Sequence, residues 1–94
     1  MLVVQRLVWD EWNTAHIARH DVFPDEVEEV CHNDPIVSET YNDRLRVIGL
    51  TGSGEILTVI LAPEDEDVYY VVTARPASRK ERQLYRAQKG GETL

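Results

Sequence analysis

The chain has 94 residues, of which 43% are hydrophobic, and it carries a net charge of -7. These figures predict one folded domain, residues 1–94, and exclude a disordered chain, two domains and the uniformly basic surface of a general nucleic-acid binder. No apolar run is long enough to span a membrane and no signal-peptide pattern opens the chain, so we expect a cytoplasmic protein. The lone cysteine, Cys31, cannot form an internal disulfide, which agrees with a reducing compartment.

The first half of the chain predicts one strand and two helices. Residues 2–8 are apolar and β-branched at their start, as in a strand, and Asp10 can cap a helix that runs to about residue 20. Pro24 suits the first position of a second helix. In that helix the apolar residues recur at spacings of three and four, so they share one face, and we expect Cys31 on that face to be buried.

The second half predicts an antiparallel sheet and a last helix. β-rich runs at residues 36–43, 44–50, 56–61 and 68–74 are separated by short turns, which is typical of a meander. Ser78 with Glu81 three residues later forms a capping box, so a helix should run from there to about residue 89, before a tail that starts at about residue 90. The expected fold is therefore α+β: an N-terminal strand, two helices, an antiparallel β-meander and a C-terminal helix, with the helices against one face of the sheet.

Cations concentrate in the second half of the chain. Ten acids and two cations precede Arg44, whereas seven acids and eight cations lie from Arg44 onward. We expect shared faces for Tyr69, Val71, Thr73 and Arg75 on one strand, for Arg44 and Arg46 on another, and for Arg79, Arg82 and Arg86 on the last helix. Because arginine grips phosphate with two parallel hydrogen bonds, these faces predict a phosphate site near the start of the last helix. The alternative is a solvated helix face, or one that docks on the acidic half of the protein.

His20 is the candidate for proton transfer, since imidazole gains and loses a proton near neutral pH. The alternative is a histidine that closes the first helix, and Asp43 and Glu39 are alternative bases. His16 and His20 have the spacing of two metal ligands, with His32 as a conceivable third. No cysteine pair or HExxH pattern accompanies them, so we expect no metal and no cofactor.

The aromatic residues divide between core and surface roles. Trp9, Trp12 and Ile17 fit core packing better than a base-stacking platform, which combines exposed rings with cations. Tyr85 follows Arg82 by one helical turn, so it either stacks on a base or anchors the last helix.

Two blocks of the sequence resemble a known family. The first holds Trp9-Asp10, Asn13, Arg19-His20, Val22, Glu26, Val30 and Asp34-Pro35, and the second holds Arg46-Val47-Ile48-Gly49, Leu57, Ala74-Arg75-Pro76-Ala77-Ser78-Arg79-Lys80-Glu81-Arg82 and Tyr85. Together they resemble the BrnT family over about residues 8–85. Members of that family are small toxins of type II toxin–antitoxin pairs, similar in fold to RelE-type ribonucleases. This chain has Arg19-His20-Asp21 where the family more often has Lys-His-Gly.

The resemblance implies a metal-independent endoribonuclease that an antitoxin with a DNA-binding domain holds inactive, and whose expression arrests growth. Its substrate would be RNA, and we expect this chain alone to bind neither DNA nor a membrane. The expected catalytic residues are His20, Arg75 and Arg79, and the expected substrate-binding residues are Arg44, Arg46, Arg82 and Tyr85. The alternative hypothesis is a non-catalytic, degenerate toxin that acts as a protein-binding module.

Overall fold

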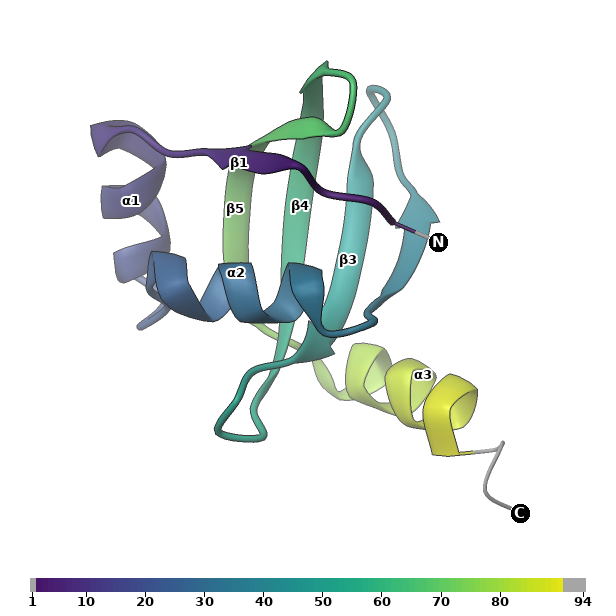
Figure 1. The fold of residues 1–94 in the computed structure, drawn as a ribbon. Helices are drawn as coiled ribbons and strands as arrows, with labels where there is room; N and C mark the ends of the chain where they lie inside the picture. Colours follow the sequence, from purple (N-terminus) through teal and green to yellow (C-terminus); the bar gives the residue numbers. More distant parts are fainter. Residues whose placement is uncertain (1, 91–94) are drawn as a thin grey trace.

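The computed structural model describes residues 2–90 and shows three helices around a five-stranded sheet (Figure 1). The elements in chain order are β1 (Arg6–Val8), α1 (Glu11–Ala18), α2 (Pro24–His32), β2 (Ile36–Glu39), β3 (Leu45–Leu50), β4 (Ile56–Asp65), β5 (Val68–Pro76) and α3 (Arg79–Gly90). The expected α+β class is confirmed. The expected tail falls on residues 91–94, which lie outside the described residues.

The sheet has the strand order β1-β5-β4-β3-β2. Strands β2 to β5 form the expected antiparallel meander, but β1 joins its edge parallel to β5, so the sheet is mixed. Two strands are shorter than expected. β1 covers only Arg6–Val8, and β2 ends at Glu39 because Asn42 and Asp43 adopt left-handed backbone angles, with φ of 62° and 58°, in the turn to β3.

The helix starts lie where the sequence predicts them. At α1, Asp10 accepts a hydrogen bond from the Asn13 N–H and donates its own N–H to the Asn13 side chain, each at 2.9 Å. The Asn13 amide also donates to the Val8 carbonyl at 2.9 Å, which ties α1 to the end of β1. Pro24 opens α2 as predicted, and α1 ends at Ala18, so His20 lies in the turn after the helix and not within it.

The main core lies between α1, α2 and one face of the sheet, here called the helix face. Its fully buried sheet residues, Val47, Leu57, Val59, Leu61, Val71 and Ala74, pack against Ile17, Val22, Val27, Val30 and Cys31. The predicted burial of Cys31 is confirmed, and burial raises the pKa of its thiol to about 12.

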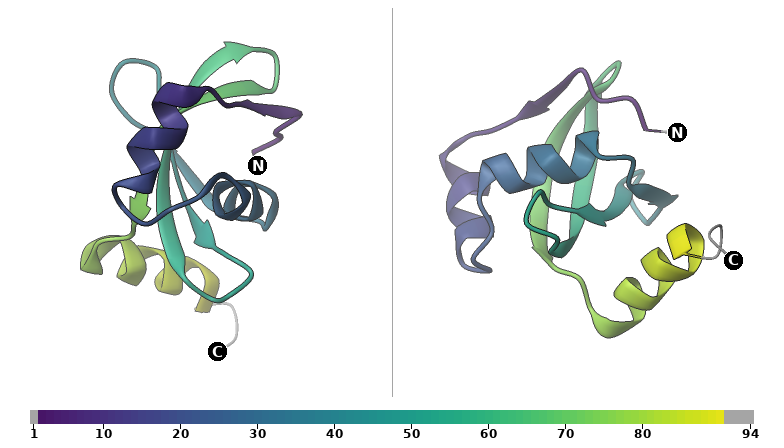
Figure 2. Two further views of the ribbon diagram at one scale, coloured as in Figure 1. Left: turned by 90° about the vertical axis from the view of Figure 1, so that its left-hand side faces the viewer. Right: turned by 60° about the horizontal axis from the view of Figure 1, so that its bottom comes forward.

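Helix α3 lies apart from this core, so the expectation that every helix covers one sheet face is wrong. A smaller cluster of Ile48, Ile56, Ala77 and Tyr85 holds α3 against the end of the sheet where β3 stops and β4 starts. Figure 2 shows α3 passing beneath that end, and its last turn reaches the α2–β2 connection, where Lys89 binds Asp34 at 2.8 Å. The sheet therefore has a second face that α3 covers only at one end.

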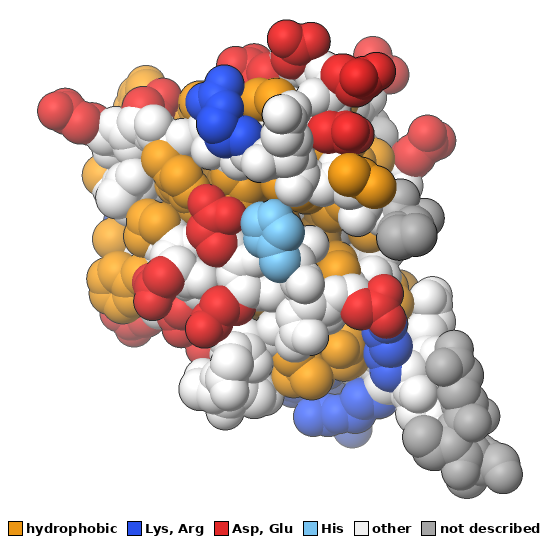
Figure 3. Space-filling view, viewed as in Figure 1, with side chains coloured by type: hydrophobic (Ala, Val, Ile, Leu, Met, Phe, Trp, Pro, Cys, Tyr) orange, Lys and Arg blue, Asp and Glu red, His pale blue; other side chains and the backbone are white. Residues whose placement is uncertain are grey.

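The surface over the helix face is dominated by acidic side chains, whereas cations gather near α3 at the lower end of the molecule (Figure 3). The uneven distribution of charge along the sequence thus corresponds to different regions of the surface, with cations near α3 and acids over the helix face. Within residues 2–90, no helix has the length and apolar character needed to cross a membrane.

Candidate functional site

Strand pairing places Arg46 and Arg75 on the second face of the sheet. Arg46 on β3 lies opposite Ile60 on β4, which lies opposite Thr73 on β5, and Arg75 lies one row farther along, opposite Thr58. Residues directly opposite in a sheet point to the same side, so all five side chains share this face. The spacing between strands and the rise per residue put the Cα atoms of the two arginines about 12 Å apart. At this distance both side chains are long enough to reach one ligand that lies between them.

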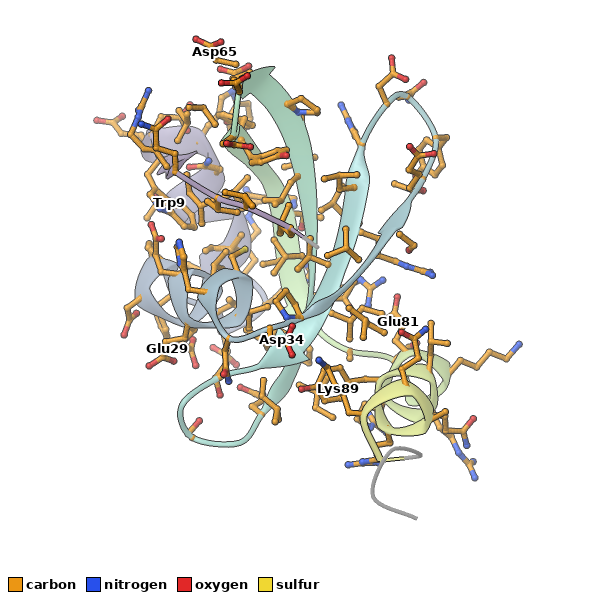
Figure 4. All side chains as sticks on the ribbon, turned by 45° about the vertical axis from the view of Figure 1, so that its right-hand side comes forward. Trp9, Glu29, Asp34, Asp65, Glu81 and Lys89 are labelled. Carbon is orange, nitrogen blue, oxygen red and sulfur yellow. The ribbon has the colours of Figure 1, made fainter. Side chains whose placement is uncertain are left out.

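Glu81 holds Arg75 in place. The Arg75 guanidinium donates two parallel hydrogen bonds to the Glu81 carboxylate, Nη1 to Oε1 at 2.7 Å and Nη2 to Oε2 at 3.0 Å. The Thr58 hydroxyl and the Ser78 N–H also donate to this carboxylate, at 2.9 and 2.8 Å. Arg75 lowers the pKa of Glu81 from 4.5 to about 2, so the carboxylate is ionised, and three of its four donors converge on Oε1. Glu81 therefore orients Arg75 from the first turn of α3, on the side of the helix that faces the sheet (Figure 4).

Arg46 contributes an unsatisfied donor to the same face. Its Nε is buried and has no hydrogen-bond partner within residues 2–90. A buried N–H without a partner is uncommon in folded proteins, which distinguishes Arg46 from the other cations of this face.

His16 of α1 and His20 in the turn that follows it lie beside the edge of β5. The His16 Nε2 is 3.1 Å from the Thr73 hydroxyl, and the His20 ring packs edge-on against the His16 ring with their centroids 5.7 Å apart. His20 is exposed, whereas His16 is half-buried. The row of Arg46 and Thr73 thus continues to His16 on α1 and, through the ring contact, to His20 in the turn after that helix.

The other expected site residues are placed differently. Arg44 precedes β3 and lines a pocket with Pro63 at the far end of the sheet, so it is a strand length from Arg75. Arg82 donates to the Ala77 carbonyl at 2.8 Å, and Tyr85 is 7% exposed within the α3 cluster. Arg79 is exposed in the first turn of α3, close in sequence to the Arg75–Glu81 pair.

The expected shared face of Tyr69, Val71, Thr73 and Arg75 is wrong. Ile60 pairs with Thr73 whereas Leu61 pairs with Val71, so β5 contains one extra residue at that point. The bulge reverses the alternation: Val71 and Ala74 point into the core, while Thr73 and Arg75 point to the second face. Nothing in the local sequence signals this bulge.

Trp12 corrects a second expectation. It is 76% exposed and does not join the core, whereas Ile17 is fully buried and Trp9 is half-buried against the core, with its Nε1–H on Glu28 at 3.0 Å. The sequence did not indicate a role for Thr58 or the contact of His16 with Thr73, because only the sheet pairing and the position of α1 bring these residues to the site. Glu81 was visible as a capping residue, but its pairing with Arg75 was not.

A metal site finds no support in the geometry of the described residues. Between residues 2 and 90, no three His, Cys, Asp or Glu side chains are grouped so that they would hold a metal ion. His32 lies in the last turn of α2, where its Nδ1 contacts the Glu28 carbonyl at 2.8 Å. The arrangement on the second face is an oriented cation, an unsatisfied arginine donor and a neighbouring histidine, which suits an anionic ligand such as a phosphate.

Comparison with known proteins places this fold among the bacterial toxins. No family model and no curated protein matches the chain. The 1.1 Å crystal structure of the Brucella abortus ribonuclease toxin BrnT does match, with a TM-score of 0.64 and 31% sequence identity. The match covers 79% of this chain and 97% of that one, so the similarity extends over nearly the full length of that structure.

Proposed function

This chain belongs to the BrnT family, and on that premise we propose that it is the toxin of a type II toxin–antitoxin pair and a metal-independent endoribonuclease. The solved relative is named as a ribonuclease toxin, and the two chains share fold and sequence over nearly its full length. The observation that supports the activity in this chain is the pair of arginines, Arg46 and Arg75, on the second face of the sheet.

In this proposal the two arginines hold the phosphate at which RNA is cut. Glu81 holds the Nη1 and Nη2 groups of Arg75. The Arg75 side chain is still 39% exposed, so the rest of its guanidinium would contact the phosphate. Arg46 supplies the buried Nε that has no partner within the described chain. Cations positioned in advance stabilise the charge that develops on phosphorus without reorganising during the reaction. Arg79, at the start of α3, adds positive charge beside Arg75.

His20 is the proposed base. It would remove the proton from the ribose 2′-hydroxyl, whose oxygen then attacks the neighbouring phosphorus to form a 2′,3′-cyclic phosphate. The 5′-oxygen of the next nucleotide is displaced and takes up a proton from water. The His16 ring, anchored at Thr73, packs against His20 and limits the orientations that its imidazole can take. The buried Tyr85 supports α3 in this scheme, and Arg44 and Arg82 contact parts of the RNA that are more distant from the cut phosphate.

The proposed partner is an antitoxin that carries a DNA-binding domain and covers the second face in the cytoplasm. An acidic segment of the antitoxin would compete with RNA for Arg46 and Arg75, because carboxylates and phosphates bind the same guanidinium edges. The chain itself would contact DNA only through that partner.

The test is cleavage of an end-labelled single-stranded RNA by the purified chain with a chelator present. Arg46→Ala and Arg75→Lys should each lower the rate by roughly 100- to 1,000-fold, because they remove one phosphate donor or the two-pronged grip of the guanidinium. His20→Ala should lower it by roughly 100- to 10,000-fold. Arg6→Ala removes the same charge from an exposed position on β1 and should cleave like the wild type.

One observation favours a second candidate function, that of a non-catalytic protein-binding module. The Glu81 carboxylate already neutralises Arg75, and the chain as a whole is acidic, with a net charge of -7. If folded, partner-free protein cuts neither naked RNA nor RNA in a ribosome-containing reaction, and its expression does not arrest growth, this second function replaces the first.

A further inference from the structure

A small pocket opens between α1 and β5, next to the histidine pair. Its walls are Trp12, Asn13, His16, Tyr70 and Val72, and its volume is about 220 Å³. The pairing of β5 with β1 ends at Tyr70, and β5 continues past that residue. Along this part of the sheet edge β5 is flanked by α1 and not by a strand. The pocket is smaller than the roughly 300–1,000 Å³ of sites that enclose drug-sized ligands, and it suits a single ring system.

Trp12 gives this pocket an exposed aromatic wall. The side chain is 76% exposed, and a large aromatic surface left in water is a common feature of binding sites. The helix does not need this ring for its own stability, because Ile17 and Asn13 supply the buried contacts of α1.

Three of the side chains that line the pocket are held by hydrogen bonds within the protein. The Tyr70 hydroxyl donates to the Asp10 carboxylate at 3.1 Å, and the His16 Nε2 contacts the Thr73 hydroxyl. Asn13 is committed to the Asp10 N–H and to the Val8 carbonyl. These bonds fix the side chains and leave ring faces as the contact surface, which lowers the entropic cost of binding a flat aromatic ligand.

The surrounding charges argue against a phosphate in the pocket itself. Asp10 and Glu11 are exposed at the start of α1, beside Trp12. A phosphate would be repelled there, whereas an uncharged ring would not. The cations of the site lie on the neighbouring second face, which the pocket meets at the contact between His16 and Thr73.

We propose that the pocket of Trp12, His16 and Tyr70 binds one unstacked base of single-stranded RNA while the arginines of the second face hold the neighbouring phosphate. This inference rests on the proposed ribonuclease function and names the part of the substrate that the pocket recognises. Single-stranded RNA is recognised by splaying out its bases and stacking them on aromatic side chains, and such stacking is tolerant of sequence. The pocket thus adds affinity for RNA through stacking, which does not depend on charge, whereas the acidic surface of the chain repels phosphates.

The experiment measures the affinity of the folded chain for a short fluorescent RNA, made uncleavable by 2′-O-methyl groups, by fluorescence anisotropy at several salt concentrations. Trp12→Ala should weaken binding by roughly 5- to 150-fold, the range for loss of one base–aromatic stack, and Trp12→Phe should recover part of it. Tyr41→Ala is the matched control, because Tyr41 is 78% exposed in the β2–β3 turn, away from the pocket.

Salt dependence separates the pocket from the phosphate site. Trp12→Ala should leave the slope of log affinity against log salt unchanged, whereas Arg46→Ala should reduce it by about 0.7, the loss of one phosphate contact on a single strand. An RNA with a series of single abasic positions should show one position at which base removal weakens the wild type but not Trp12→Ala.

Three results would overturn the base pocket, and they are distinguishable. If the wild type neither binds nor cleaves RNA, the proposed function fails and the pocket fails with it. If Arg46→Ala weakens RNA binding but Trp12→Ala matches the wild type, only the pocket is refuted. If Trp12→Ala keeps its RNA affinity but loses binding to the purified antitoxin, the exposed indole is a protein-docking surface instead.

Discussion

Replacing Glu81 by glutamine tests whether one carboxylate holds the end of β5 and the start of α3 together. The side chain of Glu81 is 10% exposed and accepts hydrogen bonds from Arg75, Thr58 and the Ser78 N–H. Its pKa falls from 4.5 to about 2 on folding, a difference worth about 3 kcal/mol at neutral pH, since one pKa unit corresponds to about 1.4 kcal/mol. Glutamine keeps the shape but leaves Arg75 without a counter-ion, so we expect Glu81→Gln to lower the free energy of unfolding by about 2–3 kcal/mol at pH 7.

The stability difference between wild type and Glu81→Gln should become smaller as the pH falls. A carboxyl group whose pKa is depressed in the folded state stabilises the protein above its unfolded pKa of 4.5, and this stabilisation is lost as the pH falls towards 2. By pH 3 the difference between wild type and Glu81→Gln should have shrunk by about 2 kcal/mol. Urea unfolding followed by circular dichroism at pH 7, 5, 4 and 3 measures it, with Glu55→Gln at an exposed turn position as the control. Equal stability at pH 7, or a difference that stays constant down to pH 3, would refute the reasoning.

Three further experiments, two substitutions and one chemical labelling, test the packing of the fold. Gly49→Ala should destabilise the chain by about 1–3 kcal/mol, because the new Cβ would lie 3.0 Å from that of Pro35 and 3.3 Å from the Val30 carbonyl; an unchanged urea midpoint would contradict this packing. Asp10→Ala should lower the free energy of unfolding by about 0.5–2 kcal/mol through loss of the α1 cap, measured in the same way, and a smaller effect would mean that the cap is dispensable. The Cys31 thiol, buried and with its pKa raised to about 12, should react with iodoacetamide at pH 8 only after unfolding; rapid alkylation of the native protein would show that the α2 core opens.

The placement of the arginines also bears on how an acidic protein can act on RNA. Most charged side chains visible over the helix face are acidic, whereas Arg46 and Arg75 lie on the other face of the sheet. Surface charges farther apart than about 8–10 Å are largely screened at physiological salt, so the local charge of the second face matters more than the net charge of the chain. The sequence revealed this asymmetry along the chain, and the fold converts it into two surfaces.

Local chemistry in the sequence determined the starts of the helices. Asp10, Pro24 and Ser78 act through bonds or backbone angles that span no more than three or four residues, so their effect can be recognised without a fold. The same holds for the strands of the meander, whose β-branched runs and short turns are local features, and for the burial of Cys31, which follows from helical spacing.

Only the tertiary structure decided which side chains meet. A single extra residue in β5 sends Thr73 and Arg75 to the opposite face from Val71, because side chains alternate with a period of two and one inserted residue reverses the alternation. The exposure of Trp12 and the contact of His16 with Thr73 depend on where α1 lies against the edge of the sheet. Burial and pairing between distant segments are set by the packing of the whole chain, whereas caps and turns are set by a few neighbouring residues, and this is why the sequence located the elements but not the site.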